Sequence, residues 1–194
     1  MDNRVADNDI HHCGVINKFV AGVFLGLSDG TPVQHNAIHD VPHHAINLGL
    51  AQDERGNLSA GSVTKTRGVY LDDFTSNCFV HGNIVFSASE ASLLLVLGVR
   101  ADDPITDSDQ NLYCVAGGRW AVHDELTDGR TAAKHRALAE WQQRGFDRHS
   151  VTGDPDFAKP QRADYSLLPD SPAHALSIVG IDQARIGPRS GRAR

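Results

Sequence analysis

The chain has 194 residues, 40% of them hydrophobic, which is enough to bury the core of one ordinary domain. It carries 18 Lys and Arg against 24 Asp and Glu, a net charge of -6, and an acidic chain repels a phosphate backbone. No apolar run approaches the roughly 20 residues of a membrane-spanning helix, and the acidic start MDNRVADND is not an export signal. We therefore expect no nucleic-acid partner, no membrane span and no signal peptide in this chain.

The cysteines indicate neither a disulfide framework nor a metal module. Cys13, Cys78 and Cys114 are odd in number and far apart, and none belongs to a CxxC or CxxH spacing. Buried free thiols are the expected state, and the sequence predicts no metal site and no cofactor.

A regular repeat is the strongest pattern in the first part of the chain. Three segments share it, GVFLG, AINLG and GVYLD, which begin at positions 22, 45 and 68. Val23, Ile46 and Val69 therefore occupy equivalent positions, and aliphatic residues alternate with other side chains as in β-strands. A second strand pattern follows the first and third segments, which predicts two strands in each repeat.

Short strands at this spacing leave no room for the helical crossovers of βαβ units. They predict an all-β solenoid, a parallel β-helix, in which each coil of about 23 residues stacks on the previous one. Equivalent side chains then form columns, aliphatic inside and polar outside. Asn36, Asn83 and Asn111 recur at equivalent places, where stacked amides can bond from coil to coil.

The pattern changes after residue 118. The segment TAAKHRALAEWQQR at 131–144 predicts a short helix with Thr131 as its N-cap and Gly145 just past its end. Residues 151–189, rich in Pro and Asp, predict an irregular cap over the end of the coil stack. The expected organisation is coils over 1–118, followed by the helix, the C-terminal capping segment and the tail over 119–194.

Several of these segments resemble the right-handed parallel β-helix proteins of the bacterial carbohydrate-active kind, which include glycoside hydrolases and polysaccharide lyases. The likeness rests on VQHNAIHDVPHHAINLG at 33–49, GVYLDDFTSNCFVHGNIVF at 68–86, QNLYCVAGG at 110–118 and the closing segment 141–188. The chain looks like the C-terminal part or a shortened copy of such a protein. The resemblance implies a right-handed coil, an extracellular or periplasmic location, and a polysaccharide or oligosaccharide partner. We expect a monomer.

Asp72 and Asp73 are the candidate catalytic residues. The resemblance implies carboxylates on an outer sheet face that a sugar chain crosses, and alternation turns Asp72 outward, in register with Gly26 and Gly49. The two carboxyl groups of a retaining hydrolase stand about 5–5.5 Å apart, so the partner should lie on an adjacent coil or turn. Asp73 and Asp40 are both available. Alternatively, the Asp-Asp pair simply begins a turn.

Four further residues are the candidate substrate-binding side chains: Tyr70, Asp40, His43 and His44. Tyr70 shares the outward direction of Asp72, where an aromatic ring can stack on a sugar. The other three crowd one corner with His39, and Pro42 forbids the helix on which His39 and His43 would face a metal together. A wall of a substrate groove is therefore favoured over a metal site.

The resemblance and the charge together predict a glycoside hydrolase-like protein that acts on a plant or microbial polysaccharide. A lyase needs a base beside an anionic sugar, whereas the acidic coils suit a neutral glycan better. The alternatives are a non-catalytic β-helix module that binds glycan or attaches to a surface, and a polysaccharide lyase. Whether the chain is an enzyme stays open at this point.

Overall fold

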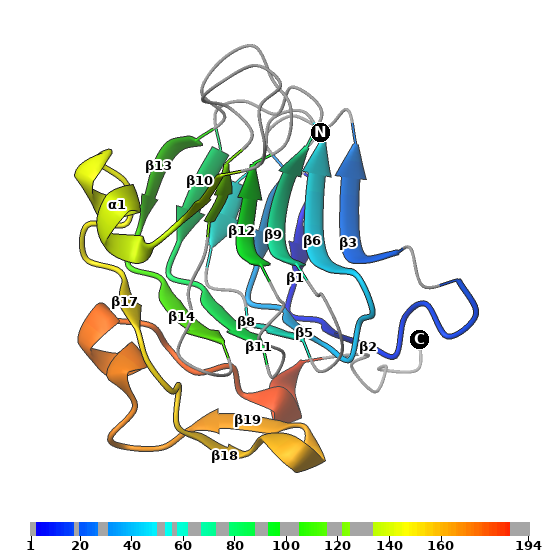
Figure 1. The fold of residues 1–194 in the computed structure, drawn as a ribbon. Coiled ribbons are helices and arrows are strands. Elements are labelled where there is room, and N and C mark those ends of the chain that lie inside the picture. The colour runs from blue at the N-terminus through cyan, green and yellow to red at the C-terminus, as the bar shows by residue number, and fades with distance from the viewer. Residues whose placement is uncertain are drawn as a thin grey trace.

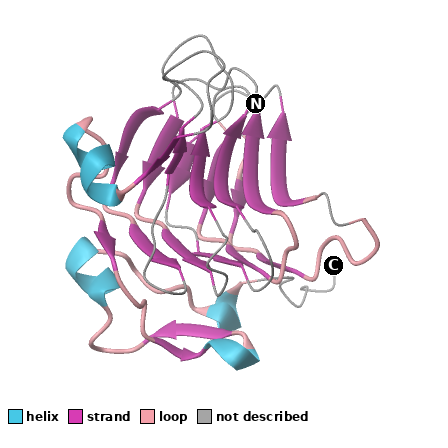
Figure 2. Cartoon of the chain, in the orientation of Figure 1, coloured by secondary structure: helices cyan, strands magenta, loops and turns pink. Residues whose placement is uncertain are grey.

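The structure is a computed structural model that describes residues 3–17, 20–26, 31–49, 53–55, 58–61, 67–72, 78–87, 93–97, 105–115, 122–124 and 134–186. Short strands dominate these residues and form three mainly parallel sheets, named A, B and C, together with one antiparallel pair (Figure 1). The α-helix α1 (Leu138–Gln143) and three 3₁₀ segments all follow residue 134 (Figure 2).

Each sheet takes every third strand of the chain. Sheet A contains β1 (Val5–Ala6), β4 (Pro32–Gln34), β7 (Asp53–Arg55), β10 (Cys78–His81) and β13 (Ile105–Asp109). Sheet B contains β2 (Asp9–His11), β5 (Ala37–His39), β8 (Leu58–Gly61), β11 (Ile84–Ser87), β14 (Leu112–Val115) and β17 (Val151–Thr152). Sheet C contains β3 (Ala21–Gly26), β6 (His44–Gly49), β9 (Arg67–Asp72), β12 (Leu93–Leu97), β15 (Val122–Asp124) and β16 (Lys134–Arg136). Three consecutive strands, one from each sheet, are called a layer below.

This topology corrects the predicted fold class, a right-handed parallel β-helix of uniform coils. The prediction had two strands in each coil and a constant repeat, whereas the structure has three separate open sheets. The repeat also varies in length, because the steps from Val69 to its partner Leu95 and from Val5 to its partner Val33 are both longer than the predicted one. Sheet C ends in the antiparallel pair β15 and β16. The structure supports the coarser class, an all-β fold, and not the uniform solenoid.

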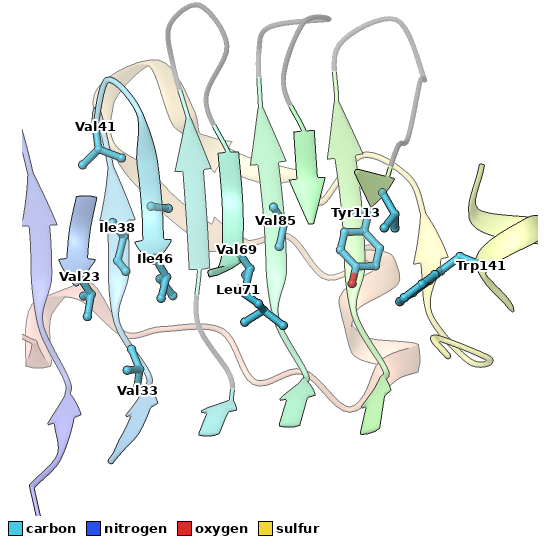
Figure 3. Packing of buried hydrophobic residues seen from close by; sticks show 12 residues of the cluster. Val23, Val33, Ile38, Val41, Ile46, Val69, Leu71, Val85, Tyr113 and Trp141 are labelled. Atoms are coloured by element: carbon cyan, nitrogen blue, oxygen red, sulfur yellow. The ribbon is translucent and has the colours of Figure 1, made fainter. Parts of the chain in front are cut away.

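The predicted register of the three longest strands is confirmed. Val23 pairs with Ile46, and Ile46 pairs with Val69. These side chains face an apolar interior that they share with Val33 of sheet A and Ile38 of sheet B (Figure 3). Complete burial of one such side chain contributes about 1.5–3 kcal/mol, so the shared interior is the main source of stability.

A ladder of asparagines stabilises the corner between sheets A and B, as predicted. Asn83 donates from its backbone N and its Nδ2 to Oδ1 of Asn111, at 2.9 and 3.1 Å, and Asn8 bonds Asn36 in the same way at 3.2 and 2.8 Å. The preceding residues all have a positive φ: Asp7, His35, Gly82 and Gln110. This left-handed step turns the chain, and the amide satisfies backbone groups that the turn would leave unpaired.

The helix near residue 140 begins later than predicted. Lys134–Arg136 is strand β16, and α1 starts at Leu138 with Ala137 as its N-cap, while Thr131 lies outside the described residues. Pairing with β15 overrides the helical propensity of the preceding residues, because an edge strand gains backbone hydrogen bonds there. Gly145, with a φ of 99°, follows the helix as expected.

Asp147 joins the closing segment to the last layer. Its carboxylate is completely buried. It accepts hydrogen bonds from five side chains: Ser108 at 2.8 Å, Asn111 at 2.8 Å, Tyr113 at 3.2 Å, Trp141 at 2.8 Å and Ser150 at 2.6 Å. A buried charge is tolerated when it is bonded in this way, so this end of the stack depends on one carboxylate.

Residues 155–186 cover the outer face of sheet B. This segment contains the antiparallel pair β18 (Phe157–Lys159) and β19 (Asp164–Leu167) and runs below sheet B in Figure 1. Its apolar side chains form a second cluster with Ala37, Ile84 and Leu112 of the sheet. This packing explains why Ala37, Ile84 and Leu112 are buried on that face. Among the described residues of sheet C, Phe24 is the exposed aromatic side chain.

Candidate functional site

An aromatic and polar column crosses the outer face of sheet C. Phe24 pairs with Asn47, and Asn47 pairs with Tyr70, on the neighbouring strands β3, β6 and β9. The Phe24 side chain is 67% exposed, and Tyr70 is half-buried. A Cβ atom added at Gly26 would come within 3.3 Å of the Phe24 ring, so the ring leans along the sheet over this glycine. The result is an outer face on which one exposed ring and one half-buried ring lie on either side of a buried amide.

Tyr70, His43 and His44, three of the predicted binding residues, lie together. The rings of His44 and Tyr70 are stacked, with centroids 5.0 Å apart, and the rings of His43 and His44 meet edge to face at 3.9 Å. His44 is only 4% exposed, whereas Tyr70 is half-buried. His44 therefore acts as a support that orients the tyrosine ring, and Tyr70 presents the surface that a ligand can contact.

Asn47 lies between the two aromatic residues of the column and is 9% exposed. Its Oδ1 atom is buried and has no hydrogen-bond partner within the described part of the chain. A buried acceptor without a partner costs about 1–3 kcal/mol.

Asp72 ends β9 in the register that the sequence predicts. It pairs with Gly49, which pairs with Gly26, so its two neighbours in that column have no side chains. The side chain of Asp72 is not among the described features, and Asp73 lies outside the described residues.

Asp40 lies at the opposite end of sheet C from Asp72. The strand β6 separates the two positions, because it begins at His44, shortly after Asp40, and ends at Gly49, the partner of Asp72. At about 3.3 Å for each residue, this strand alone spans roughly 16 Å. Glycosidase carboxylates stand about 5–9.5 Å apart. This separation does not favour Asp40 as the second carboxylate, and the choice between Asp73 and Asp40 stays a prediction.

Asp40 instead belongs to a cluster around His39 that faces the C-terminal segment. His39 Nδ1 lies 2.8 Å from Asp40 Oδ2, and His39 Nε2 lies 3.0 Å from Asp9 Oδ1. The ring of Tyr165 is 5.2 Å from the His39 ring, and burial together with Asp40 and Asp9 raises the pKa of Tyr165 to about 12. The cluster ties the first two layers to the C-terminal segment.

Sequence reasoning found His39 and Asp40 but missed Asp9 and Tyr165. Asp9 belongs to the layer before that of His39, and Tyr165 comes from a segment with no repeat that would place it. The one available signal was register, because His11 pairs with His39, which brings Asp9 to the same corner. That signal lay in the short strand β2, which has too few residues to show a period.

The described residues contain no group of three or more His, Cys, Asp and Glu side chains that could hold a metal ion. Among the same residues, no helix has the length and apolar character needed to cross a membrane. The aromatic groups on the outer face of sheet C are thus the exposed Phe24 and the half-buried Tyr70.

Comparison with known proteins gives no match: no protein-family model, curated protein or solved structure is significantly similar to this chain. The resemblance to carbohydrate-active proteins therefore gains no support from a relative. Function has to be argued from the geometry of the site itself.

Proposed function

We propose that the outer face of sheet C binds a neutral polysaccharide or oligosaccharide chain. The observation that carries this proposal is the column of Phe24, Asn47 and Tyr70, in which an exposed ring, a buried amide and a supported ring follow one another across three strands. Sugars present apolar faces that pack on aromatic rings and hydroxyl groups that bond to amides. In this column an amide lies between two aromatic rings, which is an arrangement of the two kinds of group that sugars contact.

The spacing of the column fits a chain rather than a single small molecule. Phe24 and Tyr70 lie on strands separated by one other strand, so their backbones are roughly 9.5 Å apart. This separation is comparable with the length of two linked sugars, so one chain that runs across the strands can contact both rings. A flat surface also suits an extended ligand, because small molecules usually bind in enclosed cavities.

The charge distribution favours a neutral glycan over an anionic one. Residues 1–128, which supply the parallel layers, hold 7 Lys and Arg against 17 Asp and Glu. The resulting negative field repels uronic-acid or sulfated polymers.

The proposal is tested by affinity electrophoresis and calorimetry with matched panels of neutral and anionic polysaccharides. Tyr70→Ala should weaken binding of the preferred neutral polymer by at least about tenfold, and Phe24→Ala by a similar factor, because aromatic anchors dominate such contacts. Leu168→Ala is the control, since Leu168 is a 45% exposed apolar residue on the C-terminal segment. Equal binding by the wild type, Tyr70→Ala and Phe24→Ala would refute the proposed surface.

A second function, hydrolysis of the bound glycan, is favoured by the position of Asp72. This residue lies two positions beyond Tyr70 on β9 and pairs with Gly49. A carboxyl group there could act as the acid or the nucleophile of a glycosidase if a second carboxylate stands on the adjoining turn.

Release of reducing ends from the bound polysaccharide distinguishes hydrolysis from binding alone. Asp72→Asn should abolish release while it preserves binding, and the exposed Asp170→Asn should leave both unchanged. Unchanged turnover in Asp72→Asn would remove this residue from the chemistry, and wild-type protein that binds without turnover would leave the binding function alone.

A further inference from the structure

The first layer of the fold has three free edges at one end. The strands β1, β2 and β3 are the terminal strands of sheets A, B and C, and within the described ranges no strand pairs with their outer sides. An unpaired strand edge presents a row of backbone donors and acceptors that readily pairs with another strand. This end of the stack is therefore a candidate interface.

The apolar interior also opens at this end. A hollow of about 670 Å³ is lined by these residues: Val5, Asn8, Asp9, Ile10, Gly22, Val23, Phe24 and Leu25. Four of them, Val5, Ile10, Val23 and Leu25, are aliphatic and pack with the main core. Solvent contact with such side chains is unfavourable, so an occupant that excludes water from this end gains stability.

The opposite end of the stack is partly covered by the chain itself. In β13, the carbonyl of Ser108 accepts a hydrogen bond from the backbone N of Asp147, at 2.6 Å. In β14, Leu112 and Tyr113 pair with β17, and β15 pairs with the antiparallel β16. The strands β16 and β17 are themselves terminal strands of sheets C and B, so the opposite end differs from the first layer in being covered by Asp147 and Trp141 rather than in lacking strand edges. A two-fold contact through the first layer uses the same surface on both copies, so this association ends at two copies.

The sequence of β2 is complementary to itself in antiparallel pairing. A two-fold axis across the end reverses the strand direction, so β2 meets β2 of a second copy with Ile10 opposite Ile10 of the partner subunit. Asp9 then lies opposite His11 of the partner subunit, and the same pair forms a second time by symmetry. Both residues are exposed, and a carboxylate facing an imidazole is a favourable cross-strand pair.

Other registers are less favourable. A shift of one residue places Ile10 opposite an outward polar side chain, because side chains alternate along a strand. A shift of two residues that centres on Asp9 sets two carboxylates against each other.

We propose that two copies of this chain associate end to end through β1, β2 and β3, about a two-fold axis that passes at Ile10. The small edge that these short strands offer predicts a reversible dimer with a dissociation constant in the micromolar range.

Sedimentation velocity over a range of protein concentrations tests the association. The wild type should change from monomer to dimer as the concentration rises. His11→Glu places a carboxylate opposite Asp9 of the partner subunit and should weaken the dimer at least about tenfold. His174→Glu is the matched control, because it makes the same charge change at an exposed position on the C-terminal segment and should leave the dissociation constant within about threefold.

Cross-linking tests the register. In a chain whose three cysteines are replaced by Ser, Ile10→Cys should form an intermolecular disulfide rapidly, since directly opposed residues of antiparallel strands lie about 4.5–5.5 Å apart between Cα atoms. Ile16→Cys, at a 97% exposed position outside β2, should cross-link slowly. A wild type that stays monomeric at all concentrations, or equal cross-linking at positions 10 and 16, would overturn the proposal. Neither result depends on polysaccharide binding.

Discussion

The strands at the two ends of the stack are covered to different extents. The end at β13 and β14 is closed by the chain itself, with Trp141 buried to 1% exposure and Asp147 bonded to five side chains. The end at β1, β2 and β3 has no such cover within the described residues and opens into a hollow. Closure therefore comes from one buried charge and one aromatic anchor, while the open end keeps a surface for another molecule.

The comparison shows that residues at equivalent positions along the stack need not contribute equally to the free energy of unfolding. Asparagines form the same corner ladder at both ends, but Asn111 is fully buried and bonds Asp147, whereas Asn8 is half-buried. The cost of disrupting a repeated element should thus increase from the open end toward the closed end.

The largest effect should come from Asp147→Ala. This change leaves five buried donors without their acceptor, and we expect a loss of about 3–5 kcal/mol in the free energy of unfolding. The exposed Asp170→Ala is the control and should stay within about 0.5 kcal/mol of the wild type. Urea denaturation followed by tryptophan fluorescence measures both, and a loss below about 1 kcal/mol would show that the closed end does not depend on this carboxylate.

Next in size are two matched changes in the asparagine ladder. Asn111→Ala removes a buried amide that bonds Asn83, Asp147 and the carbonyl of Val80, so we expect a loss of about 2–3 kcal/mol. Asn8→Ala at the open end should cost about 1 kcal/mol or less. Equal losses in urea denaturation would mean that the two ends are energetically alike.

A smaller difference is expected in the interior column. Val69, in the third layer, is 2% exposed, and Val23, in the first layer, is 6% exposed beside the hollow. Val69→Ala should cost about 2 kcal/mol and Val23→Ala about 1 kcal/mol, because the cavity left at the open end can fill with water. Thermal unfolding compares the two variants, and a larger loss in Val23→Ala would contradict the assignment of an open end.

The smallest effect concerns pH at the closed end. Burial raises the pKa of Asp109, but hydrogen bonds from the side chain and backbone of His149 and from the backbone of Gln110 outweigh it and lower the pKa. Asp109 therefore stabilises the fold above its unfolded pKa of about 3.9, and this contribution is lost as the pH falls through the lower folded value. Asp109→Asn should cost about 1 kcal/mol at pH 6, and this cost should shrink as the pH falls through the folded pKa. A difference that is constant across this range would exclude the carboxylate as its source.

The sequence predicted the parts of the fold that repeat. The strands that carry Val23, Ile46 and Val69 are six residues long and alternate clearly, so their register could be predicted. The strands of sheet A are too short to show a period, so β4 and β5 were predicted as one strand, as were β10 and β11, and the corner between sheets A and B was missed. The predicted spacing between equivalent strands is observed only where the connecting turns have equal length.

The candidate site could be predicted for the same reason, and its prediction failed where the repeat is irregular. Tyr70 and the glycine neighbours of Asp72 follow from register on sheet C. Asp40 and Asp72 are separated because Asp40 precedes the start of β6, whereas Asp72 pairs with the residue at its end. The contact of His39 with Asp9 depends on a layer with very short strands. Asp147 could not be foreseen, because its partners come from separate segments of the chain.

Amide hydrogen exchange measured at low and high protein concentration tests the contrast between the two ends most directly. The amides of β14, at the closed end, should be strongly protected at both concentrations, whereas those of β2, at the open end, should be protected only at the concentration at which the dimer forms. Exchange in β2 that does not depend on concentration, or exchange in β14 as fast as in β2, would contradict the account.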